Sequence, residues 1–235
     1  MNVSPIQTNN INNQSFRHDV NFWSDKSTPV KDKLVVAGSV LTGTAVAAAL
    51  MAKHAGYSLS PCKMFKNIKK SYLSKIDFEA PQVIALGAGS CIGGLTGGYL
   101  IDKNPVNRKA KRREAVMQFG NISIPILTVA GAHALTKKHG KVTSSVASVG
   151  AVFIGVYMAN FLMNKLGNAL FHNKSEARKV KPTDFSAHLD DFVLAATYIS
   201  KAQLVHALGR LVPIALMVPG NEIGNKKARD NFQQM

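Results

Sequence analysis

The stretch VIALGAGSCIGGLTGGYLI, residues 83–101, contains no charged residue. It is long enough to cross the hydrocarbon core of a bilayer as an α-helix, which takes about 20 apolar residues. Its glycines recur every four residues, a spacing that places them on one helix face. Without side chains on that face, a neighbouring backbone can approach closely, as in membrane helix packing. We therefore expect a helix-packing face at Gly89, Gly93, Gly97, Gly94 and Gly98.

A phosphate-binding loop is the alternative interpretation of GAGSCIGG within this stretch. The segment lacks the lysine of the GxxxxGK[ST] motif and the spacing of GxGxxG. In a soluble helix, each of these glycines would cost about 1 kcal/mol relative to alanine. A glycine-rich helix in lipid accounts for the pattern better than a nucleotide site. The glycine spacing is common to many unrelated membrane helices and identifies no family.

Three further runs have a similar length and apolar composition. A water-soluble helical protein would alternate polar and apolar faces within each helix, whereas these runs are apolar all round. The run at 34–52 could also be a signal peptide, but its polar leader is long and its apolar core exceeds the usual length. We predict an all-α, multi-pass transmembrane helical bundle with spans at about 34–52, 83–101, 115–136 and 142–163.

The chain carries a formal net charge of +16, from 29 Lys and Arg against 13 Asp and Glu. Such a surplus suits polyanions, either nucleic acid or anionic lipid headgroups. Because the basic loops are separated by apolar spans, they make a poor groove for nucleic acid, and we expect lipid contact instead. The basic residues divide almost evenly between the two sides of the membrane, with a small excess that favours a cytoplasmic N-terminus.

Residues 61–78 have the pattern of a basic amphipathic helix lying on the membrane surface. Four apolar side chains, including Ile76, fall on one face and three lysines on the other. A helix packed on protein would show the same pattern. The predicted contacts to lipid headgroups are Lys63, Lys66, Lys70, Phe65, Ile68 and Tyr72.

The two ends of the chain are polar. Residues 1–33 are rich in Asn, Ser and Gln and predict a disordered tail. Residues 221–235 predict a short polar tail, which leaves 34–220 as the helical membrane domain. We expect a multi-pass protein of the plasma membrane, or of the inner membrane in a bacterium.

A fifth, polar span is predicted at 192–219, within a longer helix that starts near 184. Pro213 can bend this helix, and Pro219 with Gly220 is expected to end it. A charge at the centre of a bilayer costs at least about 2.5–3.5 kcal/mol. We therefore hypothesise an interior polar path with an acidic mouth. Its side chains share one helix face: Asp184, His188, Asp191, Tyr198, His206 and Arg210.

Simpler interpretations of this stripe are acids near a helix N-terminus, snorkelling basic side chains, or a segment that lies at the interface without crossing. Asp184, His188 and Asp191 have a spacing that could present ligands to a divalent cation. Three ligands on one helix, without a second motif, are insufficient, so we expect no metal and no cofactor. The two cysteines form no disulfide framework.

The pattern favours a non-enzymatic role: a scaffold, an assembly factor or a complex subunit that packs through the glycine face as a homo- or hetero-oligomer. The first alternative is a small transporter or channel subunit that uses the polar stripe. The second is a membrane enzyme that acts on a lipid-linked substrate, with His188 and Asp191 as acid and base.

Overall fold

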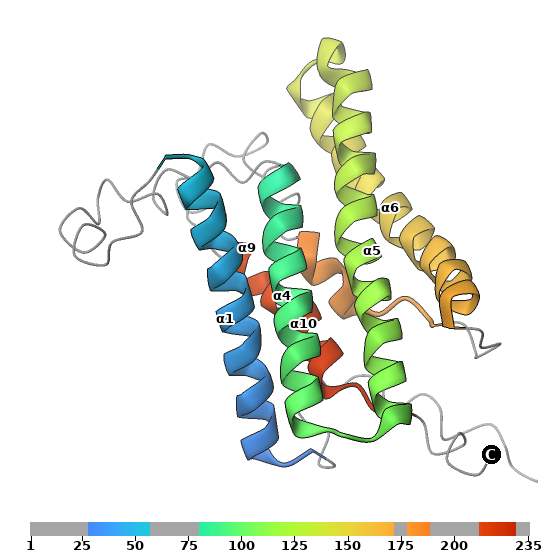
Figure 1. Cartoon of the computed structure of the whole chain (residues 1–235). Helices are drawn as coiled ribbons and strands as arrows, with labels where there is room; N and C mark the ends of the chain where they lie inside the picture. The colour runs from blue at the N-terminus through green and yellow to red at the C-terminus, as the bar shows by residue number, and fades with distance from the viewer. Residues whose placement is uncertain (1–27, 57–79, 172–177, 189–211, 229–235) are drawn as a thin grey trace, which may run out of the picture.

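The computed structural model describes residues 28–56, 80–171, 178–188 and 212–228, and within them it contains helices and no strands. The long helices are α1 (Val30–His54), α4 (Ala80–Ile101), α5 (Pro105–Thr136) and α6 (Lys141–Phe171). The shorter elements are the 3₁₀ helices η2 (Lys137–His139) and η3 (Pro182–His188), and the α-helices α9 (Val212–Ala215) and α10 (Met217–Asn225) (Figure 1).

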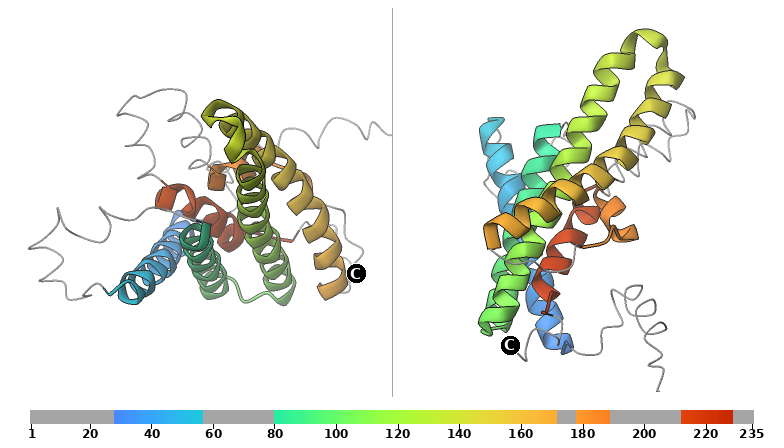
Figure 2. Two further views of the ribbon diagram at one scale, coloured as in Figure 1. Left: turned by 90° about the horizontal axis from the view of Figure 1, so that it is seen from above. Right: turned by 90° about the vertical axis from the view of Figure 1, so that its right-hand side faces the viewer.

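The four long helices stand side by side in chain order, and each runs antiparallel to the one before it (Figure 1). Viewed from above, they form a row, with η3, α9 and α10 on one face of it (Figure 2). α10 packs mainly on α4 and also contacts α5 and α1. The described part of the chain therefore has a layer of long helices and a thinner second layer of short ones.

The turn between α4 and α5 is fixed by local hydrogen bonds. Asn104 caps α5 by accepting a hydrogen bond from the backbone N–H of Val106 at 2.9 Å, and Pro105 occupies the first helical position. Arg108 reaches back and donates to the carbonyls of Tyr99 and Asp102, at 3.0 Å each. The six basic residues of 102–114 suggest a loop between two spans, but residues 105–114 are the first turns of α5.

The four long helices are each long and apolar enough to cross a membrane; for α5 the candidate span runs to His139. They contain the four spans predicted near 34–52, 83–101, 115–136 and 142–163, so the all-helical fold class is confirmed. The amphipathic helix expected at 61–78 lies outside the described residues. The tail at 1–33 is described only from residue 28 onwards.

The predicted fifth span is not confirmed. Most of it lies outside the described residues, and the part that is described is interrupted between α9 and α10. Pro219 and Gly220 were expected to end a helix, but they lie inside α10, which continues to Asn225. Pro219 falls in the first turn of α10, where a backbone N–H has no partner within the helix and a proline is tolerated. The first residues of the expected polar tail are therefore helical, and Ile223 is fully buried.

The glycines of α4 face two different neighbours. A Cβ on Gly93 would lie 2.4 Å from the carbonyl oxygen of Ser39 on α1. A Cβ on Gly94 would lie 2.0 Å from the carbonyl oxygen of Gly220 on α10. Gly89 and Gly97 also lie against α1, and Gly98 lies against α10 and the side chain of Lys111. The series that starts at Gly89 thus meets α1, while Gly94 and Gly98 meet α10.

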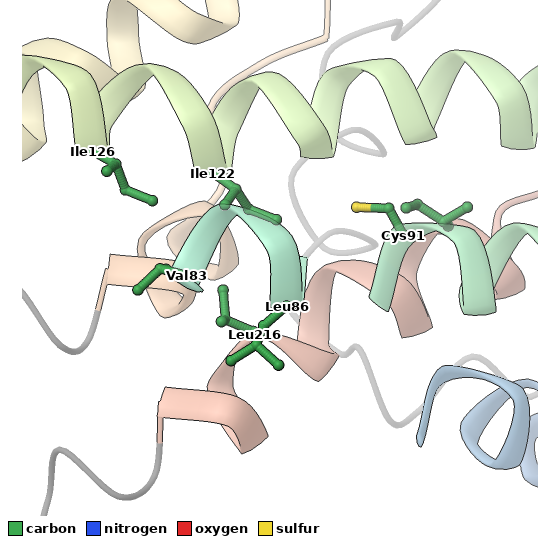
Figure 3. Close-up of a cluster of buried hydrophobic side chains, with 7 residues drawn as sticks. Val83, Leu86, Cys91, Ile122, Ile126 and Leu216 are labelled. Atoms are coloured by element: carbon green, nitrogen blue, oxygen red, sulfur yellow. The ribbon is translucent and has the colours of Figure 1, made fainter. Parts of the chain in front are cut away.

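An apolar cluster joins α4, α5 and the α9–α10 segment. Figure 3 shows how the side chains of α4 and α5 meet, with Leu216 beneath them. Leu216 is fully buried although it lies between two short helices. The cluster comprises Val83, Leu86, Cys91, Ile122, Ile126, Leu216 and Ile223.

The glycine contacts predict a position-specific effect of alanine on stability. Gly94→Ala should destabilise the protein by about 1–3 kcal/mol or more, because the added methyl group meets backbone on α10. Gly38→Ala on α1 is the matched control, since nothing lies within 4 Å of its Cβ position. Thermal unfolding in detergent measures both variants. Equal stability of the two would contradict the packing of α10 on α4.

Candidate functional site: a buried polar face of α5

Four polar side chains lie on one face of α5: Lys111, Glu114, Gln118 and Asn121. Their offsets of 0, 3, 7 and 10 residues place them along one side of a helix. All four are buried, with exposed fractions of 1%, 4%, 1% and 1%. Burying such groups is costly unless they are hydrogen-bonded or paired. The segments that cover this face, residues 178–188 and α10, supply most of the partners.

Arg178 binds three carboxylates from three different segments. Its Nε lies 3.0 Å from Oε1 of Glu114 on α5. Its Nη1 and Nη2 donate to the two oxygens of Asp184, at 2.8 and 2.5 Å, a bidentate arrangement. Its Nη2 also lies 3.6 Å from Oε2 of Glu222 on α10. One guanidinium thus joins α5, η3 and α10.

The backbone around Arg178 is fixed as well. Asn164 on α6 accepts a hydrogen bond from the N–H of Arg178 at 2.8 Å and donates to its carbonyl at 3.0 Å. Asp184 accepts a further hydrogen bond from the N–H of Lys181 at 2.8 Å. The backbone of Arg178 is therefore held by α6, while its guanidinium is bound by Asp184 of η3.

Glu222 and Glu114 share further partners. The Thr183 hydroxyl donates to Oε1 of Glu222 at 2.6 Å. The Gln118 amide donates to Glu222 and, at 3.0 Å, to Glu114. Lys226 lies 3.2 Å from Oε2 of Glu114 and is the most exposed of these ionic groups. We call this set the Arg178 cluster: Glu114, Gln118, Arg178, Thr183, Asp184, Glu222 and Lys226.

Lys111 extends the polar face toward the end of α10. Its Nζ donates to the carbonyls of Gly224 and Lys226, at 2.7 Å each, and lies 3.9 Å from Oδ2 of Asp102. A cation is favoured at a helix C-terminus, where carbonyl groups lack partners within the helix. Asn107, one turn earlier on α5, accepts a hydrogen bond from the N–H of Ala228 at 2.9 Å. α5 thus binds the chain continuously from Glu222 to Ala228.

The carboxyl group of Glu222 in the Arg178 cluster has a raised pKa. Burial raises the pKa of Glu222; the hydrogen bond from Thr183 opposes this, and the charge of Glu114 adds to it. For Arg178, burial would lower the pKa, but Glu114 and Asp184 outweigh it and raise the pKa above its ordinary value. Arg178 therefore stays charged, and Glu222 takes up a proton at a higher pH than an exposed glutamate does.

His188 and Asn121 form the inner end of the polar face. The His188 side chain is fully buried, and its Nε2 lies 2.7 Å from the backbone carbonyl oxygen of Asn121. Because a carbonyl oxygen only accepts, Nε2 carries the proton. The amide nitrogen and oxygen of the Asn121 side chain are buried without a hydrogen-bond partner in the described part of the chain.

The structure places the predicted site residues as follows. Asp184 and His188 lie in the 3₁₀ helix η3, against α5, and not on the first turns of a long α-helix. The remaining stripe residues and the predicted headgroup contacts lie outside the described residues: Asp191, Tyr198, His206, Arg210, Lys63, Lys66, Lys70, Phe65, Ile68 and Tyr72.

The sequence interpretation missed Lys111, Glu114, Arg178 and Glu222 as members of a site. A weak signal was present on α5, because Glu114, Gln118 and Asn121 follow one another at offsets of 0, 4 and 7 residues. The six basic residues of 102–114 concealed it by suggesting a solvated loop. Nothing local distinguishes Arg178 from the other basic residues of its segment.

Comparisons with protein-family models, curated proteins and solved structures gave no match. Within the described residues, no group of three or more His, Cys, Asp or Glu side chains is arranged to hold a metal ion. The arrangement in the Arg178 cluster instead matches carboxylates to a guanidinium and an ammonium group. Because the comparisons gave no match, the role of the Arg178 cluster is inferred from its geometry alone.

Removal of the central cation should be strongly destabilising. Arg178→Gln leaves buried carboxylates without their partner, which typically costs about 3–5 kcal/mol. Arg112→Gln is the matched control, because Arg112 is exposed on α5 and its loss should change stability by less than about 0.5 kcal/mol. Unfolding in mixed micelles, followed by circular dichroism, compares the two. Similar midpoints for both variants would be inconsistent with the cluster as described.

The raised pKa of Glu222 predicts a pH-dependent stability difference. The folded state favours the protonated carboxyl, so this stabilisation is complete below the pKa of the unfolded chain and is lost as the pH rises through the folded pKa. Glu222→Gln stays neutral and should gain stability relative to the wild type as the pH rises. Melting temperatures of both proteins over a pH series test this. A difference that is constant with pH, or that has the opposite slope, would exclude a raised pKa.

Proposed function

We propose that the chain is an integral, multi-pass membrane protein that acts as a non-enzymatic scaffold, assembly factor or complex subunit. The length and composition of the four long helices support a membrane location. So do the large apolar side chains exposed along α1 and α6, such as Leu41, Ile154 and Tyr157, which are 57–67% exposed. In a bacterium, the location we propose is the inner membrane.

The observation that carries the non-enzymatic role is the internal pairing of the Arg178 cluster. Charged residues inside a membrane protein usually mark a substrate or ion pathway. In this protein, every charged side chain of the cluster binds another member of it, and the partners come from α5, η3 and α10. These charges therefore hold segments of the chain together, which is an architectural role.

The surface for a partner differs from the one expected from sequence. The glycines of α4 pack against α1 and α10 of the same chain. Gly38 on α1, Gly131 on α5 and Gly150 on α6 are exposed, and nothing lies within 4 Å of a Cβ built on any of them. Another helix could approach closely at these positions. We propose that homo- or hetero-oligomers form there.

The scaffold proposal predicts an assembly larger than one chain. Solubilised from its own membrane in mild detergent, the protein should migrate on native gels, and appear in native mass spectra, as a complex. Gly150→Leu and Gly38→Leu should shift it toward the single chain without lowering its melting temperature, because both positions are open. Gly131→Leu extends the test to α5. A wild-type protein that is a single chain under these conditions would contradict the proposal.

A small transporter or channel subunit is the second candidate, and one observation favours it. The side-chain amide of Asn121 is buried without a partner in the described residues, beside the Asn121 backbone carbonyl that accepts the hydrogen bond from His188. A polar group without a hydrogen-bond partner inside a helical bundle could contact an ion or solute that crosses the membrane. Under this alternative, the chain alone in proteoliposomes would conduct, and Asn121→Leu would abolish the flux. Absence of flux for the wild type favours the scaffold.

A further inference from the structure

Arg113 lies between α5 and α6 and, unlike Arg178, forms no salt bridge in the described residues. Its Nη2 donates to Oδ1 of Asn168 on α6 at 3.0 Å. A Cβ on Gly167 would lie 3.5 Å from its Nε, so the guanidinium crosses α6 where that helix has no side chain. Asn168 takes one of the five N–H donors of a guanidinium, and the planar group is thus held in place with donors remaining.

Lys165 lies one turn before Asn168 on α6 and about 60° around the helix from it. Its side chain is exposed, and its ammonium group lies 4.4 Å from the centre of the Phe161 ring. Within the described residues, neither Arg113 nor Lys165 forms a salt bridge, whereas Arg178, Lys111 and Lys226 all do. Two cations that form no salt bridge in the described part of the chain therefore lie at the same end of the α5–α6 pair, although the charge of Glu114 acts on Arg113.

Exposed apolar side chains continue from these cations toward the middle of the helices. Phe161 is 58% exposed and Tyr157 is 62% exposed, one and two turns before Lys165 on α6. On α5, Phe119 is 42% exposed and lies nearer the middle of the helix than Arg113. α5 and α6 are antiparallel (Figure 1), so Arg113 near the start of α5 and Lys165 near the end of α6 lie at the same end of the pair. The three aromatic side chains lie nearer the middle of their helices.

We propose that Arg113 and Lys165 bind the phosphate of an anionic phospholipid whose acyl chain lies along Phe161 and Tyr157. This inference depends on the proposed membrane location. A guanidinium and an ammonium group complement a phosphate diester. Basic sites between helices at the headgroup level recognise anionic lipids, and the adjacent aromatic residues would contact a lipid chain but not a free phosphate ion.

The test uses the full-length protein purified in a nonionic detergent. It is titrated with phosphatidylglycerol, with phosphatidylcholine and with inorganic phosphate, and bound lipid is counted by native mass spectrometry. Wild type should bind phosphatidylglycerol in preference to the other two. Arg113→Gln/Lys165→Gln should lower the apparent affinity by about fivefold for each cation removed. Lys138→Gln/Lys141→Gln, which removes two exposed lysines at the opposite end of α5 and α6, should retain it.

Lys165→Gln alone changes only an exposed side chain and keeps the test decisive if the double variant fails to fold. An unchanged affinity in this variant, or an equal loss in the Lys138/Lys141 control, would overturn the site. Equal binding of inorganic phosphate would replace the lipid by a free anion. Failure of the membrane location itself would appear separately, as a wild-type chain that stays folded and monomeric in buffer without detergent.

Discussion

The second layer of the structure, formed by η3, α9 and α10, depends on the ion pairs of the Arg178 guanidinium. This guanidinium is bound by carboxylates from α5, η3 and α10, elements that are far apart in sequence. Burying an ion pair gives little net stability compared with well-packed apolar side chains, but removing one partner is costly. The ionic contacts therefore act mainly by excluding arrangements in which the three segments are displaced. Lys111 adds to this by binding the C-terminal carbonyls of α10.

The glycines of α4 and the polar face of α5 act on the same short helix. α10 has nine residues, fewer than the roughly 12–15 that an isolated helix needs in water. On one side it approaches α4 backbone to backbone at Gly94 and Gly220. On the other side Glu222 binds Gln118 and Arg178. Close backbone packing and directional polar contacts together replace the length that α10 lacks.

The long helices could be predicted from sequence because their signal is local. An uncharged run of span length predicts a helix wherever its neighbours lie, and residues 34–52 and 142–163 are examples. The polar face of α5 depends on contacts across the chain. Glu114 meets Arg178, 64 residues away, and Gln118 meets Glu222, 104 residues away. Sequence spacing predicted close packing at the glycines of α4 but could not tell which neighbour each glycine meets.

The proposed membrane location explains why charges are kept in such an apolar protein. Between helices in lipid there is little hydrophobic driving force, because the acyl chains are as apolar as the side chains they would replace. The four long helices can each be held by the bilayer itself, since each is long enough to cross it. η3 and α10 are too short for that. They require contacts that lipid cannot offer, and a guanidinium shared by three carboxylates is such a contact. The internal charges are thus concentrated where short segments must be attached to long ones.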